Sequence, residues 1–155
     1  MMSREVVVRL ATDTATCGIS GVVDDDAAIC NVEDAMTSDE LVNRVHSVST
    51  STPGRALNEV RNHQLVIDEP THLGGPGEQI TPAEAFLASV SACGVLLVQG
   101  RARDTGVRLD QVDATIEGVR HRSDTSVFQR IELRFRLSGP SQAQAIDLVD
   151  HYKRR

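Results

Sequence analysis

Aromatic side chains are scarce in this sequence, and so are clusters of basic residues. Only 3% of the 155 residues are aromatic, with no Trp and one Tyr. The core must therefore be built from aliphatic side chains, and aromatic stacking on nucleic-acid bases is poorly supported. The net charge is −6, and no basic face is available for a phosphate backbone. We expect no nucleic-acid partner.

Cysteine and histidine are few and scattered. The three cysteines, Cys17, Cys30 and Cys93, include no CxxC pair, and the five histidines include no pair at helical spacing. Neither pattern matches the ligand spacing of a zinc site, so we expect no metal and no cofactor. An odd number of lone thiols suits a reducing cytoplasm, where disulfides are rare.

Long hydrophobic runs are also missing. The longest nearly apolar stretch, residues 85–98, has 14 residues, whereas a membrane-spanning helix needs about 20. Residues 1–9 lack the apolar core that a signal peptide has after its charges. The sequence thus predicts a soluble cytoplasmic protein without a membrane partner.

The acidic residues are concentrated in the N-terminal third. Residues 1–50 carry nine acids and three bases, whereas residues 51–155 carry thirteen of each. The structural patterns become clearer from about Arg44 onward. We therefore divide the chain into an N-terminal acidic segment of unknown role, residues 1–43, and one folded domain, residues 44–155.

Local patterns predict an α+β fold of antiparallel sheets with helices on one side. The clearest element is a helix over residues 82–105, since Thr81 is a capping residue, Pro82 suits the first turn and Gly106 suits the C-terminus. Its middle is apolar almost all round, so we expect it to be buried on every side. The remaining expected elements are strands at 5–10, 44–50, 63–67, 109–119 and 128–137 and a helix at 142–152.

Cys93 lies in the middle of this helix and admits two interpretations. Its neighbours on one helical face are Phe86, Val90 and Leu97, so it is either a buried, inert core cysteine or a reactive thiol. A position in mid-helix lacks the positive dipole end that commonly activates a cysteine. Any activation must come from a positive group delivered by another part of the fold.

Several motifs around Cys93 agree in order and spacing with one family. They are Asp68-Glu69-Pro70, Leu73-Gly74-Gly75, Thr81-Pro82 with Glu84, and Ser91-Ala92-Cys93-Gly94, with Cys93 eleven residues after Pro82. The chain from residue 44 onward thereby resembles the OsmC/Ohr family of osmotically inducible and organic hydroperoxide resistance proteins. The resemblance implies an OsmC-like fold with a long central helix, in an intertwined homodimer with active sites at the interface.

The resemblance also implies a function, a thiol-dependent peroxidase that reduces organic hydroperoxides in oxidative stress defence. Cys93 would be oxidised to a sulfenic acid, a second cysteine would form a disulfide with it, and an external dithiol would reduce that disulfide. An arginine held by a glutamate activates the thiol in this family. The candidates here are Arg55 or Arg61, with Glu84 as the glutamate.

Three features depart from the family pattern. The family's second cysteine follows the last helix, so either the chain is truncated just before it at Arg155 or it lacks this partner. Ala83 stands where the family has a glutamate, and Glu84 equally suits a capping box with Thr81. Cys17 or Cys30 could replace the missing thiol. The alternative function is therefore a non-catalytic or ligand-binding OsmC-like protein.

Overall fold

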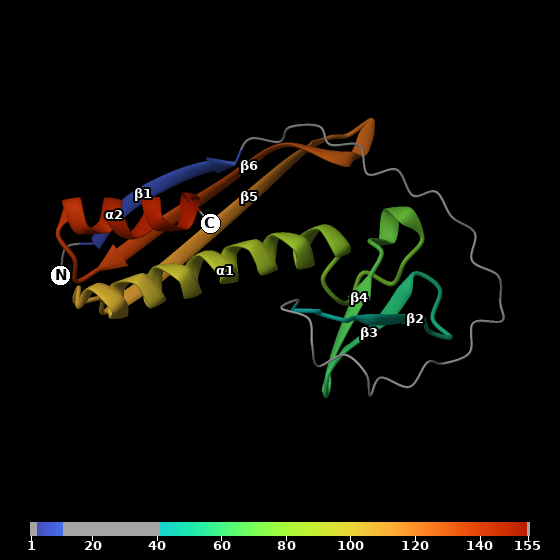
Figure 1. Cartoon of the computed structure of the whole chain (residues 1–155). Helices are drawn as coiled ribbons and strands as arrows, with labels where there is room; N and C mark the ends of the chain where they lie inside the picture. Colours follow the sequence, from blue (N-terminus) through green and yellow to red (C-terminus); the bar gives the residue numbers. More distant parts are fainter. Residues whose placement is uncertain (1–2, 11–40, 155) are drawn as a thin grey trace.

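The computed structural model describes residues 3–10 and 41–154 (Figure 1). Cys17, Cys30 and most of the N-terminal acidic segment lie outside these residues. In chain order the elements are β1 (Ser3–Leu10), β2 (His46–Ser49), β3 (Arg55–Val60), β4 (His63–Asp68), the 3-10 turn η1 (Thr71–Leu73), α1 (Pro82–Thr105), β5 (Gln111–His121), β6 (Asp124–Ser138) and α2 (Gln142–Lys153). The α+β class predicted from the sequence is confirmed.

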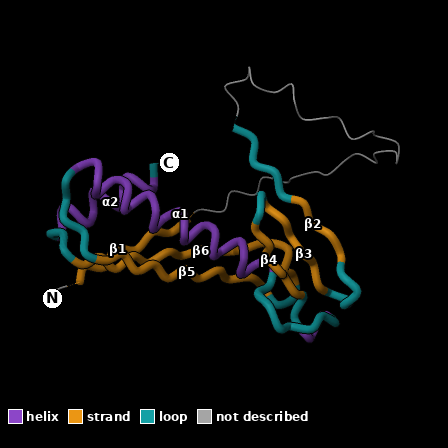
Figure 2. Tube along the Cα trace, turned by 90° about the horizontal axis from the view of Figure 1, so that it is seen from below, coloured by secondary structure: helices purple, strands orange, loops and turns teal. Residues whose placement is uncertain are grey.

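The larger sheet has the strand order β1-β6-β5, with both pairings antiparallel. Along β6, Leu133, Phe135 and Leu137 are fully buried, whereas the alternate residues Arg134 and Arg136 are more exposed. This alternation is expected where one face of an antiparallel sheet is covered and the other faces water. Figures 1 and 2 show α1 and α2 side by side on the covered face.

Both helices begin with a capping box, and this local chemistry fixes where they start. In α1 the Thr81 hydroxyl accepts from the Glu84 amide, while the Glu84 carboxylate accepts from the Thr81 amide; Ser141 and Gln144 do the same for α2. Gly106 ends α1 with a φ of 67°, a left-handed conformation that glycine adopts without strain. The predicted bounds of α1 are confirmed.

The smaller sheet has the order β2-β3-β4 and lies beyond the N-terminal end of α1 (Figure 1). The sequence predicted β2 and β4, but it missed β3 as a separate strand. The reason is the two-residue connection between Val60 and His63, which contains Arg61 and Asn62 rather than the glycine that usually marks a tight hairpin. Arg61 adopts a φ of 55° there.

A single aliphatic core joins the larger sheet to both helices. Phe135 is at its centre, and a Cβ placed on Gly94 of α1 would lie 2.7 Å from the Phe135 Cζ. The helix therefore approaches the sheet closely only because residue 94 has no side chain. The buried members of this core are Val8, Val98, Ala102, Leu133, Phe135, Leu137, Ala145, Leu148 and Val149.

The chain covers only one side of α1, so the prediction of a helix buried on every side is wrong for a single chain. Of its 24 residues, only Gly94, Val98 and Ala102 are buried. Leu96 is 66% exposed and Phe86 is 48% exposed. The sheet and α2 can contact only the face that is turned toward them, and the remaining apolar face stays open.

Among the described residues, α1 is also the one helix whose length and composition would allow it to cross a membrane. A single helix of this kind is only a weak indication of a membrane protein. The capping box and the basic residue Arg103 in its last turn are found equally in helices of water-soluble domains.

Two glycines of α1 provide a test of the packing. We expect Gly94→Ala to destabilise the fold by about 1–3 kcal/mol, because the added methyl group would collide with the fully buried Phe135. Gly100→Ala is the matched control, since the nearest atom to its new methyl group is the Arg103 Nη2 at 3.9 Å. It should stabilise the helix by up to about 1 kcal/mol. Urea unfolding curves measure both changes, and equal effects at the two positions would contradict this packing.

Candidate functional site

Cys93 lies near the middle of α1, and its residue is exposed in the single chain. The adjacent Gly94 is buried against Phe135, so Cys93 sits where the covered face of the helix gives way to the open one. Leu96 of the same helix is largely exposed, and Phe86 is about half exposed. The interpretation as a buried, inert core cysteine therefore fails for the single chain, and the sulfur is accessible beside an apolar surface.

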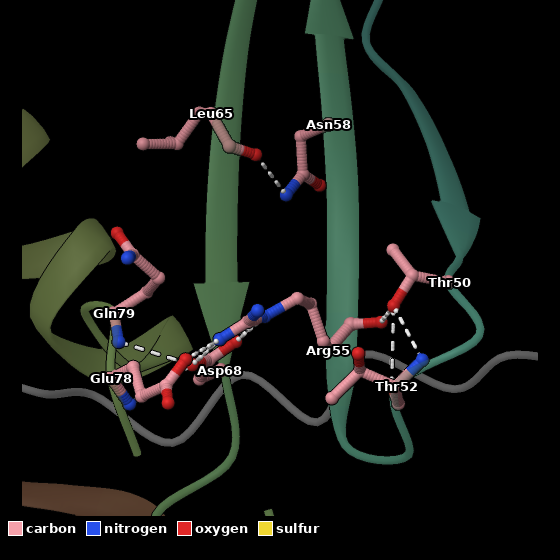
Figure 3. Close-up of polar contacts among 8 residues, drawn as sticks. All are labelled: Thr50, Thr52, Arg55, Asn58, Leu65, Asp68, Glu78 and Gln79. Atoms are coloured by element: carbon pink, nitrogen blue, oxygen red, sulfur yellow. Dashed lines mark hydrogen bonds and ion pairs between the residues drawn. The ribbon is translucent and has the colours of Figure 1, made fainter. Parts of the chain in front are cut away.

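Arg55 opens β3 and is held by two carboxylates (Figure 3). Its Nε donates to the Asp68 Oδ1 at 2.7 Å, and its Nη2 donates to the Asp68 Oδ2 and to the Glu78 Oε2, both at 2.8 Å. Asp68 is directly opposite Arg55 in the antiparallel pair of β3 and β4. Such a fork-to-carboxylate pair is among the strongest polar contacts in proteins.

Asp68 is the buried centre of this network. Its side chain is completely inaccessible to water, and the Asp68 Oδ2 also accepts from the backbone amides of Glu78 and Gln79, each at 3.0 Å. The pKa of Asp68 is lowered to about 2. The hydrogen bonds from Arg55 are the main cause, and those from the two backbone amides are a further cause. The carboxylate therefore fastens the loop that leads into α1 onto the β3–β4 hairpin.

Arg61 does not lie near Cys93, as a group that activates the thiol would have to. It occupies the exposed tip of the β3–β4 hairpin, at the end opposite Arg55 and Asp68. Figure 1 shows this tip projecting away from α1. Within its own chain, Arg61 is thus a turn residue remote from Cys93.

Glu84 is engaged in capping the helix. Its Oε2 accepts from the Thr81 amide at 2.7 Å and from the Thr81 hydroxyl at 2.8 Å. These two hydrogen bonds, with a smaller contribution from the charge of Arg120, lower the pKa of Glu84. The capping role that the sequence offered as the alternative is the one that the geometry supports.

The four residues nominated from the sequence do not form one site within a single chain. Arg55 and Pro82 line the same cavity of about 410 Å³ at the start of α1. Cys93 follows Pro82 by eleven residues, which is about 16 Å along a helix. An arginine from this end of the molecule therefore cannot serve the thiol of its own chain without a large rearrangement.

Two residues near α1 were not identified from the sequence. Arg120 lies with its guanidinium 5.3 Å from the ring centroid of Phe128, which is stacked on Phe86. Tyr152 of α2 packs edge-on against Phe135, and burial is the main cause that raises the pKa of Tyr152. Arg120 and Phe128 are cross-strand partners in the β5–β6 hairpin, whereas the stacking of Phe86 on Phe128 joins distant segments that no local spacing predicts. Within the described ranges, no group of three His, Cys, Asp or Glu residues is placed to hold a metal.

Comparison with known proteins identifies the family. The family model for OsmC-like protein matches residues 75–155, which include α1 with Cys93, the β5–β6 hairpin and α2. Because this match spans more than half of the chain, the protein belongs to the OsmC-like family, as the motifs around Cys93 predicted. No curated protein sequence matches the chain.

Solved structures have the same fold at low sequence identity. An OsmC-like protein from Mycoplasma pneumoniae aligns with a TM-score of 0.60 and 17% identity, covering 76% of this chain and 84% of that one. An organic hydroperoxide resistance protein OsmC from Legionella pneumophila aligns with a TM-score of 0.54 and 21% identity, covering 72% and 81%. For one from Elizabethkingia anophelis the TM-score is 0.55 and the identity 14%, with coverage of 75% and 83%.

The depressed pKa of Asp68 predicts a specific acid sensitivity. Because the folded value, about 2, lies below the ordinary 3.8, the ionised carboxylate contributes stability that is complete above about pH 4 and is lost as the pH falls toward 2. Asp68→Asn should therefore be less stable than the wild type at pH 7. The gap between their urea midpoints should close between about pH 4 and pH 2. A gap that stays constant over this range would contradict the network.

Proposed function

We propose that this protein is a thiol-dependent peroxidase that reduces organic hydroperoxides in the cytoplasm, with Cys93 as the reacting thiol. The observation that carries the proposal is the exposed Cys93 on the open apolar side of the central family helix. An apolar surface beside the sulfur accepts an alkyl chain better than it accepts hydrogen peroxide. Two of the similar structures are described as organic hydroperoxide resistance proteins.

The reaction follows from thiolate chemistry. The sulfur of Cys93 attacks the terminal oxygen of R–O–O–H, so that an S–O bond forms while the O–O bond breaks. The alkoxide takes up a proton and leaves as the alcohol, and sulfur loses the two electrons that the peroxide gains. A second thiol then condenses with the sulfenic acid, releasing water, and an external dithiol reduces the resulting disulfide. These steps would serve oxidative stress defence.

A homodimer is part of this proposal, because one chain leaves both α1 and Cys93 incomplete. The uncovered apolar side of α1, with Leu96, is a surface that a second copy would bury. The roughly 16 Å of helix between Pro82 and Cys93 separates the thiol from Arg55 of its own chain. In a dimer, an arginine from the partner's smaller sheet would be available to the thiol instead.

The second candidate is a non-catalytic, ligand-binding OsmC-like protein. The observation that favours it is that Arg55, bonded to Asp68 and Glu78, lies at the start of α1 and not beside Cys93 of its own chain. Glu84 is likewise used as a helix cap. In this case the apolar side of α1 would bind a ligand or a partner without oxidation of Cys93.

The dimer predicts a defined effect of charge on the open side of α1. Wild-type protein should have the mass of two chains by light scattering at micromolar concentration, and Leu96→Glu should halve it, since the carboxylate would be buried without a partner. The leucine is 66% exposed in the single chain, so the variant should still fold. Val119→Glu is the control, because Val119 points away from α1 while the adjacent Gly118 faces Leu87. A wild-type protein with the mass of one chain would contradict the proposed dimer.

The chemistry is tested by intact mass after one equivalent of cumene or tert-butyl hydroperoxide. We expect one added oxygen that dimedone traps as a sulfenic acid, and no addition in Cys93→Ser. Loss of two hydrogens instead would show that Cys17 or Cys30 resolves the sulfenic acid. Wild-type protein that stays unmodified, like the serine variant, would favour the non-catalytic candidate.

A further inference from the structure

The N-terminal half of α1 carries an exposed aromatic ring on the same side as the thiol. Figures 1 and 2 show that α2 ends beside the middle of α1, whereas the β5–β6 hairpin continues along its N-terminal half. Phe86, Val90 and Cys93 follow one another at spacings of four and three residues, which places their side chains on one side of a helix. Phe86 is 48% exposed, and Cys93 is exposed as well.

The β5–β6 hairpin holds the Phe86 ring in place. The ring stacks on Phe128, with centroids 5.8 Å apart and an interplanar angle of 23°. The Arg120 guanidinium lies 5.3 Å from the centroid of the Phe128 ring, and its Nη1 donates to the Thr125 carbonyl at 3.0 Å. Phe128 also lies against Gly118, where a Cβ would be 2.4 Å from the Phe128 Cε1. Phe86 therefore presents its exposed area from a supported position.

The helix surface between the ring and the thiol is apolar. Val90 lies between them and is partly buried. The Ser89 hydroxyl, on the adjoining part of the helix, donates to the Phe86 backbone oxygen at 2.7 Å. A hydrocarbon chain along this surface would gain from burial without leaving that hydroxyl unpaired.

The spacing of the two residues sets the length of chain that fits. Phe86 and Cys93 are seven residues apart, which is about 10.5 Å along a helix axis. Both side chains lean toward the N-terminus of the helix, so the ring and the sulfur stay separated by about the same distance. An extended carbon chain advances about 1.2 Å per bond, as an extended backbone does. A chain of about eight bonds therefore reaches from the sulfur to the ring.

We propose that Phe86 is a specificity-determining residue, the far wall of a subsite for the apolar group of the molecule that reacts at Cys93. The favoured class of ligand has its reactive group at one end of an unbranched apolar chain of about eight bonds. As a subsite for a hydroperoxide it rests on the proposed function, because the reactive group is then R–O–O–H. Phe128 and Arg120 position the ring. A supported ring loses little side-chain entropy when the chain end packs on it.

N-alkylmaleimides of increasing chain length test this subsite without any peroxide. In a Cys17→Ser/Cys30→Ser background, Cys93 is the only thiol, and its disappearance gives a second-order rate constant. From N-ethylmaleimide to N-octylmaleimide this rate constant should rise by about tenfold or more, since each fully buried methylene contributes about fourfold. Glutathione gives the same ratio for a thiol without a subsite. A ratio for the protein no larger than that for glutathione would overturn the proposal.

Phe86→Ala in the same background identifies the wall. The octyl-to-ethyl ratio should fall by about fivefold or more, because the chain end loses the ring, while the N-ethylmaleimide rate stays the same. Val127→Ala is the matched control. Val127 is 46% exposed and precedes Phe128 in β6, so its side chain points to the opposite face of the sheet, and its loss should leave the ratio as it was.

Two results with Phe86→Ala would sink the proposal. An unchanged ratio would mean that the ring does not contact the chain. An equal loss of rate with both maleimides would mean that Phe86 only packs α1 against the hairpin. The thermal midpoint shows whether the variant is folded, and if it is not, the wild-type ratio against glutathione and the same ratio in Phe86→Leu decide the matter. Phe86→Leu keeps an apolar group but removes the flat ring, so it should give a ratio between those of wild type and glutathione.

A matching series of n-alkyl hydroperoxides separates this proposal from the proposed function. If no hydroperoxide adds oxygen to Cys93 yet the maleimide ratio depends on Phe86, the peroxidase function fails and the subsite stands. If oxygen is added at a rate that does not depend on chain length, and the maleimide ratio equals that of glutathione, the subsite fails and the peroxidase function stands.

Discussion

The covering of one long apolar helix is the constraint on which the rest of the structure depends. α1 can lie close to the larger sheet because Gly94 leaves room for the ring of Phe135, and on that side Val98 and Ala102 complete the contact. The same approach orients Cys93 toward the edge of the covered face, where it stays exposed. The chain itself thus buries only one face of α1. Any surface that covers the other face also covers the thiol of Cys93.

The charged network at the start of α1 attaches a glycine-rich loop to the β3–β4 hairpin. The buried carboxylate of Asp68 makes this attachment by accepting hydrogen bonds from Arg55 and from two backbone amides. The Nε and Nη2 groups of Arg55 are used in this way. In the single chain Arg55 therefore attaches the loop at the start of α1 and does not reach the thiol.

How much of this follows from sequence depends on whether the cause is local. The bounds of α1 were predictable because Thr81, Pro82 and Gly106 act on their immediate neighbours. The strand β3 was missed because Arg61 forms its tight turn in a conformation that usually selects glycine. Cys93 could be nominated from motif spacing, but its separation from Arg55 depends on how a helix meets a sheet. The contact of Tyr152 with Phe135 likewise depends on how α2 packs on the sheet.

The few aromatic residues have a further consequence. All four of them, three Phe and one Tyr, form two pairs, Phe86 with Phe128 and Phe135 with Tyr152. Each pair joins a helix to β6, and both lie against α1. Near-ultraviolet circular dichroism of this protein therefore reports how α1 and α2 are packed on the larger sheet. A partly folded state that kept its strands and helices but loosened both helices from the sheet would lose the aromatic signal while its far-ultraviolet spectrum changed little.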